Sequence, residues 1–184
     1  VWAMGRTIDD LILAAMTGNA TSVSSTDAAS DVALPSAQKV VHGSAGMTMA
    51  KLRTARKILR EADIDPDEEL YLAISGDKMD DLFAESGTPI INFDYNDKKP
   101  MVSGTIGSFF GFNFIHTERL NNDSDGNQQV LAWAKSGVGL SIGQNIETKI
   151  SERPDKNYSM QAYAQMSLGS VRVQDNHVIE IACQ

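Results

Sequence analysis

Apolar residues recur at helical spacing near the start of the chain. Ile8, Leu11, Ile12 and Ala15 occupy positions i, i+3, i+4 and i+7, so they share one face of a predicted helix. Gly18 follows, and we expect it to adopt the left-handed conformation that ends many helices. The segment Asn19–Ala33 is rich in Ser, Thr, Ala and Asp, which predicts a loop or mobile linker.

A second helix is predicted from Met49 to Ala62, with Thr48 as its N-cap. Its apolar stripe consists of Met49, Leu52, Ala55, Leu59 and Ala62. Its basic residues are expected on the solvated face: Lys51, Arg53, Arg56, Lys57 and Arg60. This face lacks the interleaved aromatic residues that stack on nucleic-acid bases, so a solvated surface is favoured over a partner surface. Pro66 confirms the end of the helix.

Short apolar runs and strict alternation predict strands in the rest of the chain. The segment Leu70–Ser75 is predicted as a buried strand, Asp77–Ser86 as a third helix and Pro89–Phe93 as a further strand. Alternation then marks Phe112–Phe114, Val138–Ile142, Met160–Met166 and, as a terminal hairpin, Val171–Ile181. The polar segment Asn121–Gln128 predicts a turn or a mobile tip, and Val32–Gly46 fits neither the helix nor the strand pattern. Helices followed by a run of strands indicate an α+β fold rather than a doubly wound sheet.

Composition narrows the possible functions. The 184 residues include 24 acidic and 16 basic side chains, a net charge of −8, which argues against a protein that grips nucleic acid. No apolar run is long enough to span a membrane, so no membrane partner is expected. The single cysteine, Cys183, excludes an internal disulfide.

Motifs for catalysis and cofactor binding fail at identifiable positions. Asp63, Asp65 and Asp67 begin like a calcium loop, but Glu68 stands where glycine is required and Ile74 where the bidentate glutamate is required. The glycines Gly137, Gly139 and Gly143 miss the dinucleotide spacing and are interpreted as bulges or close-packing points. The histidines His42, His116 and His177 show no metal-ligand spacing, and Glu180 is expected to face solvent from a strand. We therefore predict no catalytic, cofactor or metal residues.

Several segments, taken in order, resemble the major capsid proteins of tailed bacteriophages and prophages. The resemblance extends over nearly the whole chain, and the order and spacing of the segments carry it. The segments are Arg6–Leu13, Thr17–Ala20, Met47–Leu59, Tyr71–Ser75, Asp81–Leu82, Asp94–Asn96, Gly104–Ile115, Leu168–Val173 and Val178–Ile181.

The resemblance implies the tailed-phage major capsid fold (HK-ninety-seven-like), with a peripheral domain built around a spine helix and an axial domain. On this basis residues 1–46 are expected to hold the spine helix, 47–145 mainly the axial domain, and 146–184 strands that return to the peripheral domain. Family members carry an N-terminal arm and an extended loop before the spine helix. Because this chain starts at Val1 without an initiator Met, we expect it to be truncated there.

The function implied is that of a structural, non-enzymatic subunit of an icosahedral capsid, made in the host cytoplasm and located in the virion. Its expected partners are other copies of itself in capsomers, and scaffold and portal proteins, without specific nucleic-acid binding. Two alternatives stay open at this stage: an encapsulin-like shell protein, and an enzyme whose site is assembled only by folding. A cleft that joins His42, His116 or His177 to carboxylates and a serine would favour the enzyme.

Overall fold

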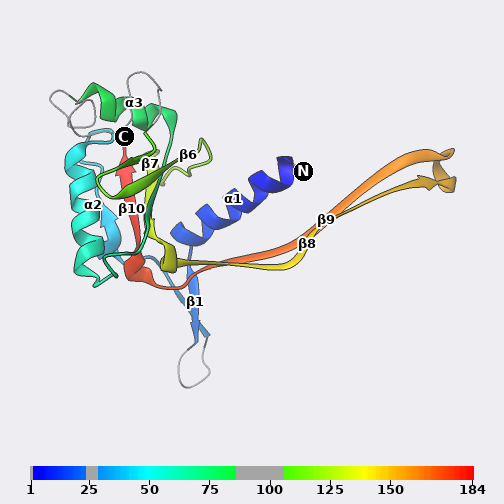
Figure 1. Ribbon diagram of the computed structural model, residues 1–184, viewed down its shortest axis with the longest axis horizontal. Coiled ribbons are helices and arrows are strands. Elements are labelled where there is room, and N and C mark those ends of the chain that lie inside the picture. Colours follow the sequence, from blue (N-terminus) through cyan, green and yellow to red (C-terminus); the bar gives the residue numbers. More distant parts are fainter. Residues whose placement is uncertain (1, 24–28, 86–105) are drawn as a thin grey trace.

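The computed structural model describes residues 2–23, 29–85 and 106–184, and most of its buried core surrounds a six-stranded mixed sheet. This sheet lies at one end of the molecule (Figure 1). The strand order is β3-β10-β7-β4-β6-β5. In that order the strands are Lys39–Val40, Val178–Cys183, Gln128–Ala134, Leu70–Ile74, Phe112–His116 and Ser108–Phe109. Only the β10–β3 and β4–β6 pairs are parallel, which confirms the α+β class.

Two helices complete this part of the molecule, which we call the body. Helix α2 (Met49–Glu61) begins at Thr48, whose Oγ1 accepts a hydrogen bond from the Lys51 amide at 3.4 Å, as an N-cap should. Its stripe of Leu52, Ala55 and Leu59 is fully buried and packs over β10, β7 and β3. Each buried leucine contributes about 2 kcal/mol from its apolar area. Helix α3 (Gly76–Ala84) follows β4 and buries Met79 and Leu82.

The basic face of α2 differs from the prediction at one residue. Lys51 is only 8% exposed, and its Nζ donates to the carbonyls of Ala45, Gly46 and Ala182 at 2.7, 2.8 and 3.0 Å. The Arg56 guanidinium lies over the Phe110 ring, 4.7 Å from its centroid. Nothing in the sequence distinguishes Lys51 from its solvated basic neighbours. It is buried because the nearby carbonyls of Ala45 and Gly46, together with the distant carbonyl of Ala182, accept from its three donors.

Glu180 was expected to face solvent, and that expectation is wrong. It is 5% exposed, with Lys39 Nζ 2.9 Å from its Oε2 and Gln129 Nε2 3.0 Å from its Oε1. The reason is that β10 is an inner strand of the sheet, with five of its six residues buried. Side chains on both faces of β10 are therefore covered by protein, and a charged side chain on either face needs a partner.

Within the predicted linker Asn19–Ala33, the described residues include two paired strands rather than loop alone. Strands β1 (Ala20–Val23) and β2 (Ala29–Val32) pair antiparallel, with Ala20 opposite Val32 and Val23 opposite Ala29. Thr21 Oγ1 donates to Asp31 Oδ1 at 3.1 Å across the pair. Strand pairing is made by backbone hydrogen bonds and does not require apolar side chains. Because this hairpin is mainly exposed, its sequence lacks the apolar alternation that would distinguish it from a loop.

Helix α1 (Trp2–Thr17) precedes that hairpin and does not end as predicted. Gly18 is not among the residues with positive φ, and its amide donates to the Ala14 carbonyl at 2.8 Å in a regular helical bond. The carbonyls at this end of α1 are satisfied by a side chain from another part of the molecule, described below.

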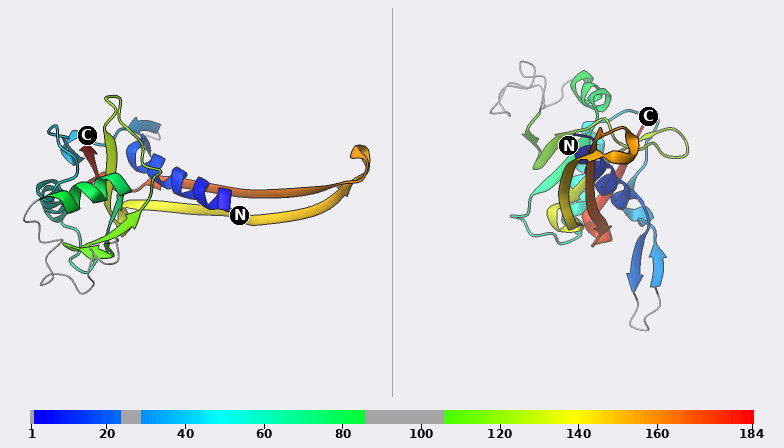
Figure 2. Two further views of the ribbon diagram at one scale, coloured as in Figure 1. Left: turned by 90° about the horizontal axis from the view of Figure 1, so that it is seen from above. Right: turned by 90° about the vertical axis from the view of Figure 1, so that its right-hand side faces the viewer.

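The longest strands form a two-stranded hairpin that leaves the body (Figures 1 and 2). We call β8 (Val138–Arg153), β9 (Ser159–Arg172) and their connection η4 (Pro154–Lys156) the long hairpin. Strand β9 pairs with β8, whereas β10 pairs with β7 and β3, so the predicted terminal hairpin Val171–Ile181 is wrong. The short helix η5 (Asp175–His177) turns the chain back into the sheet between them.

The glycines of this region act as predicted. The register of β8 shifts between Ile142 and Gln144, which places Gly143 at a β-bulge. At Gly137 an added Cβ would lie 2.9 Å from the Cβ of His177. The chain segments that contain Gly137 and His177 therefore pass each other at close range. Asn121–Gln128 is a turn, in which Asp123 Oδ1 accepts from the Asp125 and Asn127 amides at 2.9 Å. The predicted strand Pro89–Phe93 lies outside the described residues.

Candidate functional site: the long hairpin and its base

The long hairpin exposes large apolar side chains along most of its length. Beyond Gly139 every residue of β8 is exposed. The exposed fractions reach 74% at Ile150, 70% at Tyr158 and 68% at Met160. Further exposed apolar side chains of the hairpin are Leu140, Ile142, Ile146, Tyr163 and Val171. Apolar surface gathered in this way on one element marks an interaction surface.

The base of the hairpin is held by Arg172, whose side chain is completely buried. Its guanidinium donates to the carbonyls of Met16 at 3.0 Å, Gly18 at 2.6 Å and Val32 at 2.9 Å, and it pairs with Asp175. One side chain therefore joins the end of α1, the end of the β1–β2 hairpin, β9 and η5. It also supplies the C-terminal cap of α1 that the sequence assigned to Gly18.

Helix α1 is held between the long hairpin and the body. On one side Ser170 Oγ of β9 donates to the Leu11 carbonyl at 2.8 Å. On the other, the Arg119 guanidinium forms a two-bond ion pair with the Asp10 carboxylate. The hydrogen bond from Arg119 lowers the pKa of Asp10 below its ordinary value, and the same bond raises the pKa of Arg119. A cleft of about 200 Å³ remains between α1 and the body, lined mainly by apolar residues together with Asp9, His116 and Thr117.

The structure brings one histidine to a serine, as the enzyme alternative requires. Ser136 Oγ lies 2.8 Å from His177 Nδ1, and Glu68 Oε1 accepts from the Ser136 amide at 2.6 Å. The pKa of Glu68 is lowered, mainly by hydrogen bonding with the Ser136 side chain; the bond from the Ser136 amide and the charge of His177 lower it further. A catalytic triad needs the carboxylate on the second ring nitrogen of the histidine, whereas Glu68 is bonded to the serine backbone. The contact joins η3 (Lys135–Gly137) to η5, the two connections at the base of the hairpin.

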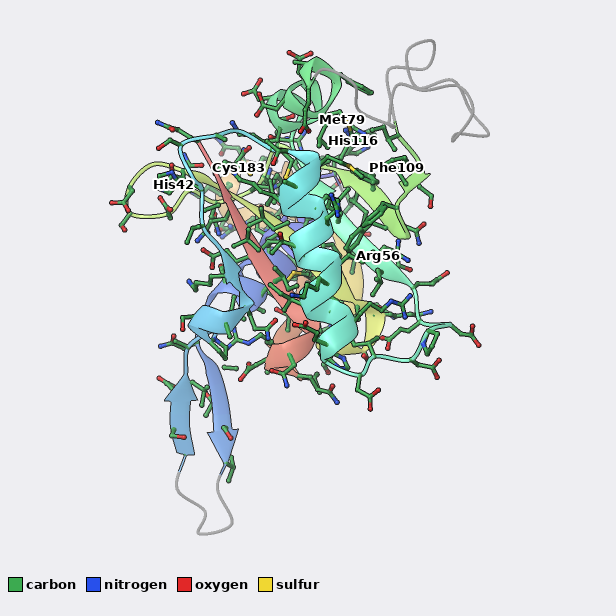
Figure 3. All side chains as sticks on the ribbon, turned by 90° about the vertical axis from the view of Figure 1, so that its left-hand side faces the viewer. His42, Arg56, Met79, Phe109, His116 and Cys183 are labelled. Atoms are coloured by element: carbon green, nitrogen blue, oxygen red, sulfur yellow. The ribbon has the colours of Figure 1, made fainter. Side chains whose placement is uncertain are left out.

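The remaining chemical candidates are dispersed. His42 Nδ1 accepts from the Ser44 amide at 3.0 Å, and His116 lies at the end of β6. Figure 3 labels both with Cys183, which is fully buried at the end of β10. Within residues 2–23, 29–85 and 106–184 no three His, Cys, Asp or Glu side chains are grouped so that they could hold a metal. In the same ranges no helix combines the length and hydropathy needed to cross a membrane.

Cys183 and Lys51 form a buried pair with no sign of reactivity. Burial raises the pKa of the Cys183 thiol, and burial also lowers the pKa of Lys51, whose Nζ lies 3.9 Å from the sulfur. A raised thiol pKa keeps the thiolate population low, and the thiolate is the reactive form.

Sequence reasoning missed Arg172 because the three carbonyls that it binds lie 140 to 156 residues earlier in the chain. The one available signal was an arginine on an otherwise uncharged strand, since Ser159–Arg172 contains no other charged residue. A charge in such a position is buried only when it is paired, which makes it a candidate for a structural contact.

Comparison with known proteins identifies the family. The model of a family described as phage capsid protein matches residues 1–184. None of the curated proteins matches in sequence. Solved structures that are similar include Mycobacterium phage Che8 (TM-score 0.69, 16% identity, 98% of this chain and 59% of that chain) and the head of Helicobacter pylori bacteriophage KHP40 (0.70, 15%, 99% and 66%). The capsid of cyanophage Pam1 is similar to the same degree (0.70, 12%, 98% and 66%).

These likenesses show the fold that the sequence resemblance implied. The chain spans 59 to 66% of the length of these three structures, so it matches a part of each.

Proposed function

Because the chain belongs to the phage capsid protein family, we propose that it is a structural subunit of a phage or prophage capsid. It associates with copies of itself into capsomers that enclose DNA, and its place is the virion. The role requires complementary surfaces between subunits rather than a reactive pocket. Scaffold and portal proteins are further proposed partners, and host-cytoplasmic synthesis is part of the same proposal.

The observation that carries this proposal is the exposed long hairpin. A two-stranded ribbon is at best marginally stable by itself, and covering one of its faces would stabilise it. Its tip, at the end of strands of 16 and 14 residues, lies far from the body (Figure 2). A projecting element with Ile150, Tyr158 and Met160 uncovered is what a subunit needs in order to reach its neighbours.

We further propose a division of the chain that follows its elements. The boundary expected at 145/146 falls inside β8, and a domain boundary within a continuous strand is unfavourable. Helix α1 and the long hairpin would form the peripheral domain, with α1 as the spine helix. The body, to which β10 returns, would be the axial domain.

The net charge of the chain supports a shell that encloses DNA without binding it sequence-specifically. A net charge of −8 opposes adhesion to phosphates, since binding to nucleic acid depends on neutralising them with Lys and Arg. We therefore propose no base-specific contact.

The experiment is assembly of the complete gene product that contains this chain. Closed particles seen by negative-stain microscopy, with this chain as the main component, would support the proposal. A double variant, I150D with M160D, should lower the particle yield at least about tenfold while circular dichroism stays unchanged. The matched control is V41D, which places an aspartate on the body at a residue that is 76% exposed, and it should assemble normally. If the unaltered protein forms no particles and is absent from virions, the proposal is wrong.

A further inference from the structure

The net charge of the chain is distributed unevenly. Helix α2 carries five of the 16 basic residues and one of the 24 acidic residues, so the helix has a charge of +4. Because the whole chain has a charge of −8, the remaining residues sum to −12. Four of the cations of α2 lie within about 100° of one another around the helix axis. We call them the cationic stripe: Arg53, Arg56, Lys57 and Arg60.

The cationic stripe points away from the rest of the molecule. The opposite side of α2 is buried against the core, while Arg53, Lys57 and Arg60 are exposed. Helix α2 forms the outer edge of the body in Figure 1. In Figure 3 it stands in front of the sheet, and no described element lies over it. The stripe is therefore open to a partner.

Little of the charge of the stripe is neutralised within the described part of the chain. There, neither Arg53 nor Arg60 forms an ion pair, and Lys57 pairs with Glu61 at 3.5 Å, where both side chains are mostly exposed. Such exposed pairs are weak and are screened by salt. Of the acidic residues that follow α2, two bond to β4 and η3 instead.

The turn between β5 and β6 fixes the one half-buried member of the stripe. Arg56 Nη1 donates to the Phe110 carbonyl, and the guanidinium lies over the Phe110 ring. An added Cβ at Gly111 would lie 2.8 Å from that Nη1, so a side chain there would displace the guanidinium. Arg56 thus adds positive potential beside the stripe, and the three exposed cations remain available to bind.

The composition of the stripe indicates what kind of partner it fits. Protein interfaces have an apolar centre, and none of the large exposed apolar side chains in the described residues belongs to α2. A partner of this face must therefore be recognised by its negative charge alone. Three of the four cations are arginines, whose planar guanidinium matches the oxygens of a phosphate. The lack of aromatic residues excludes stacking on bases, but contacts to phosphates do not need them.

We propose that the cationic stripe binds the phosphate backbone of the enclosed DNA without reading its sequence, and that α2 faces the interior of the shell. This inference rests on the proposed function, which supplies the DNA. From Arg53 to Arg60 the helix rises about 10 Å, and duplex DNA carries about one negative charge per 1.7 Å of its axis. Each of the three exposed cations can therefore meet a phosphate. The acidic residues elsewhere oppose this contact only weakly, because salt screens exposed charges beyond about 8–10 Å.

The first experiment measures DNA binding by free subunits of the complete gene product. Fluorescence anisotropy of a short labelled duplex gives the association constant at several NaCl concentrations. Three phosphate contacts predict that its logarithm falls with log[NaCl] with a slope of about −2.7. The double variant R53Q with R60Q should make the slope shallower by about 1.8 and lower the affinity at least about tenfold at low salt.

The matched control is R6Q with K135Q, which removes the same charge from exposed residues of α1 and η3. It should change the affinity less than about threefold, and circular dichroism checks that both double variants are folded. Equal losses in the two double variants would overturn the assignment to the stripe. If the unaltered subunits bind no DNA but form normal particles, the inference is wrong while the proposed function stands.

Competition distinguishes phosphates from carboxylates. Unlabelled duplex should displace the labelled duplex at least about tenfold more effectively than poly-glutamate of the same total charge. Equal displacement would show that the stripe fits an acidic protein segment, which would overturn the inference.

A photo-cross-link locates α2 in the shell. Thr54 is exposed next to Arg53, and replacing it by benzoylphenylalanine in a minority of subunits places a photoreactive group beside the stripe. In DNA-filled particles it should cross-link to DNA with at least about fivefold higher yield than the same replacement at Ser124, which is exposed in a turn without basic residues. Equal yields, or cross-links from residue 54 to protein alone, would contradict the inference and leave the proposed function intact. If the protein forms no particles, or only particles without DNA, the proposed function fails and this inference fails with it.

Discussion

Replacing Arg172 by methionine should test how the long hairpin is fixed to the rest of the molecule. Methionine retains an unbranched apolar side chain but removes every donor of the guanidinium. The carbonyls of Met16, Gly18 and Val32 would lose their donors, and Asp175 would lose its counter-ion. Because the side chain of Arg172 is completely buried, water cannot replace these bonds without opening the junction.

The size of the effect follows from burial. Removing one partner of a buried charged pair costs about 3–5 kcal/mol. Asp175 is 32% exposed and regains part of its hydration, so the lower part of this range applies. We expect R172M to lower the free energy of unfolding by about 3 kcal/mol. Such a loss is large against the roughly 5–15 kcal/mol by which folded proteins are stable.

The assay is urea unfolding followed by tryptophan fluorescence, which Trp133 can report because it packs against the core of the body. The matched control is R153M at the hairpin tip, where Arg153 pairs with Asp155 but both side chains are about half exposed. Exposed pairs contribute at most about 1 kcal/mol, so the control should unfold almost like the unaltered protein. A loss below about 1 kcal/mol in R172M, or equal losses in both variants, would refute the role assigned to Arg172.

Three further predictions concern α1, the core and the crossing at the base of the hairpin. Because the folded pKa of Asp10 lies below its ordinary value of 3.8, its pairing with Arg119 stabilises the fold above that pH. This stabilisation should be lost as the pH falls through the lowered pKa of Asp10. The protection of α1 amides from exchange should therefore fall with acid in the unaltered protein and fall less in D10N. The same acid dependence in both proteins would contradict the prediction. F112A should lower the unfolding free energy by about 3–5 kcal/mol, because Phe112 is fully buried, whereas Y163A on the exposed hairpin should change it little in the same urea titration. G137A should lower the free energy of unfolding by about 1–3 kcal/mol, because the added methyl group would collide with His177. The control is G107A, since a methyl group added at Gly107 meets no atom within 4 Å. Equal thermal midpoints for the two variants would show that the backbone around Gly137 and His177 can relax.

The sequence by itself determined the elements whose signals are local. The stripe from Met49 to Ala62 and the cap at Thr48 predicted α2 to within one residue, because helix periodicity and capping involve neighbours in the chain. Leu70–Ser75 and Phe112–Phe114 were identified as strands for the same reason. The order of segments along the whole chain also carried the capsid resemblance that the family comparison confirmed.

Tertiary structure alone decided which strands pair and which charges are buried. Val171–Ile181 has the alternation of a hairpin, but β10 joins β7 because the six-stranded sheet offers it two partners. Glu180 and Lys51 resemble solvated charges in sequence. These two residues and Arg172 are buried because each has at least one partner that is distant in the chain. Alternation also could not show that Met166 and Leu168 are half-buried on the strand that α1 contacts, while Met160 and Ala162 are exposed. That difference depends on how far a helix with a rise of about 1.5 Å per residue extends along strands with a rise of about 3.3 Å.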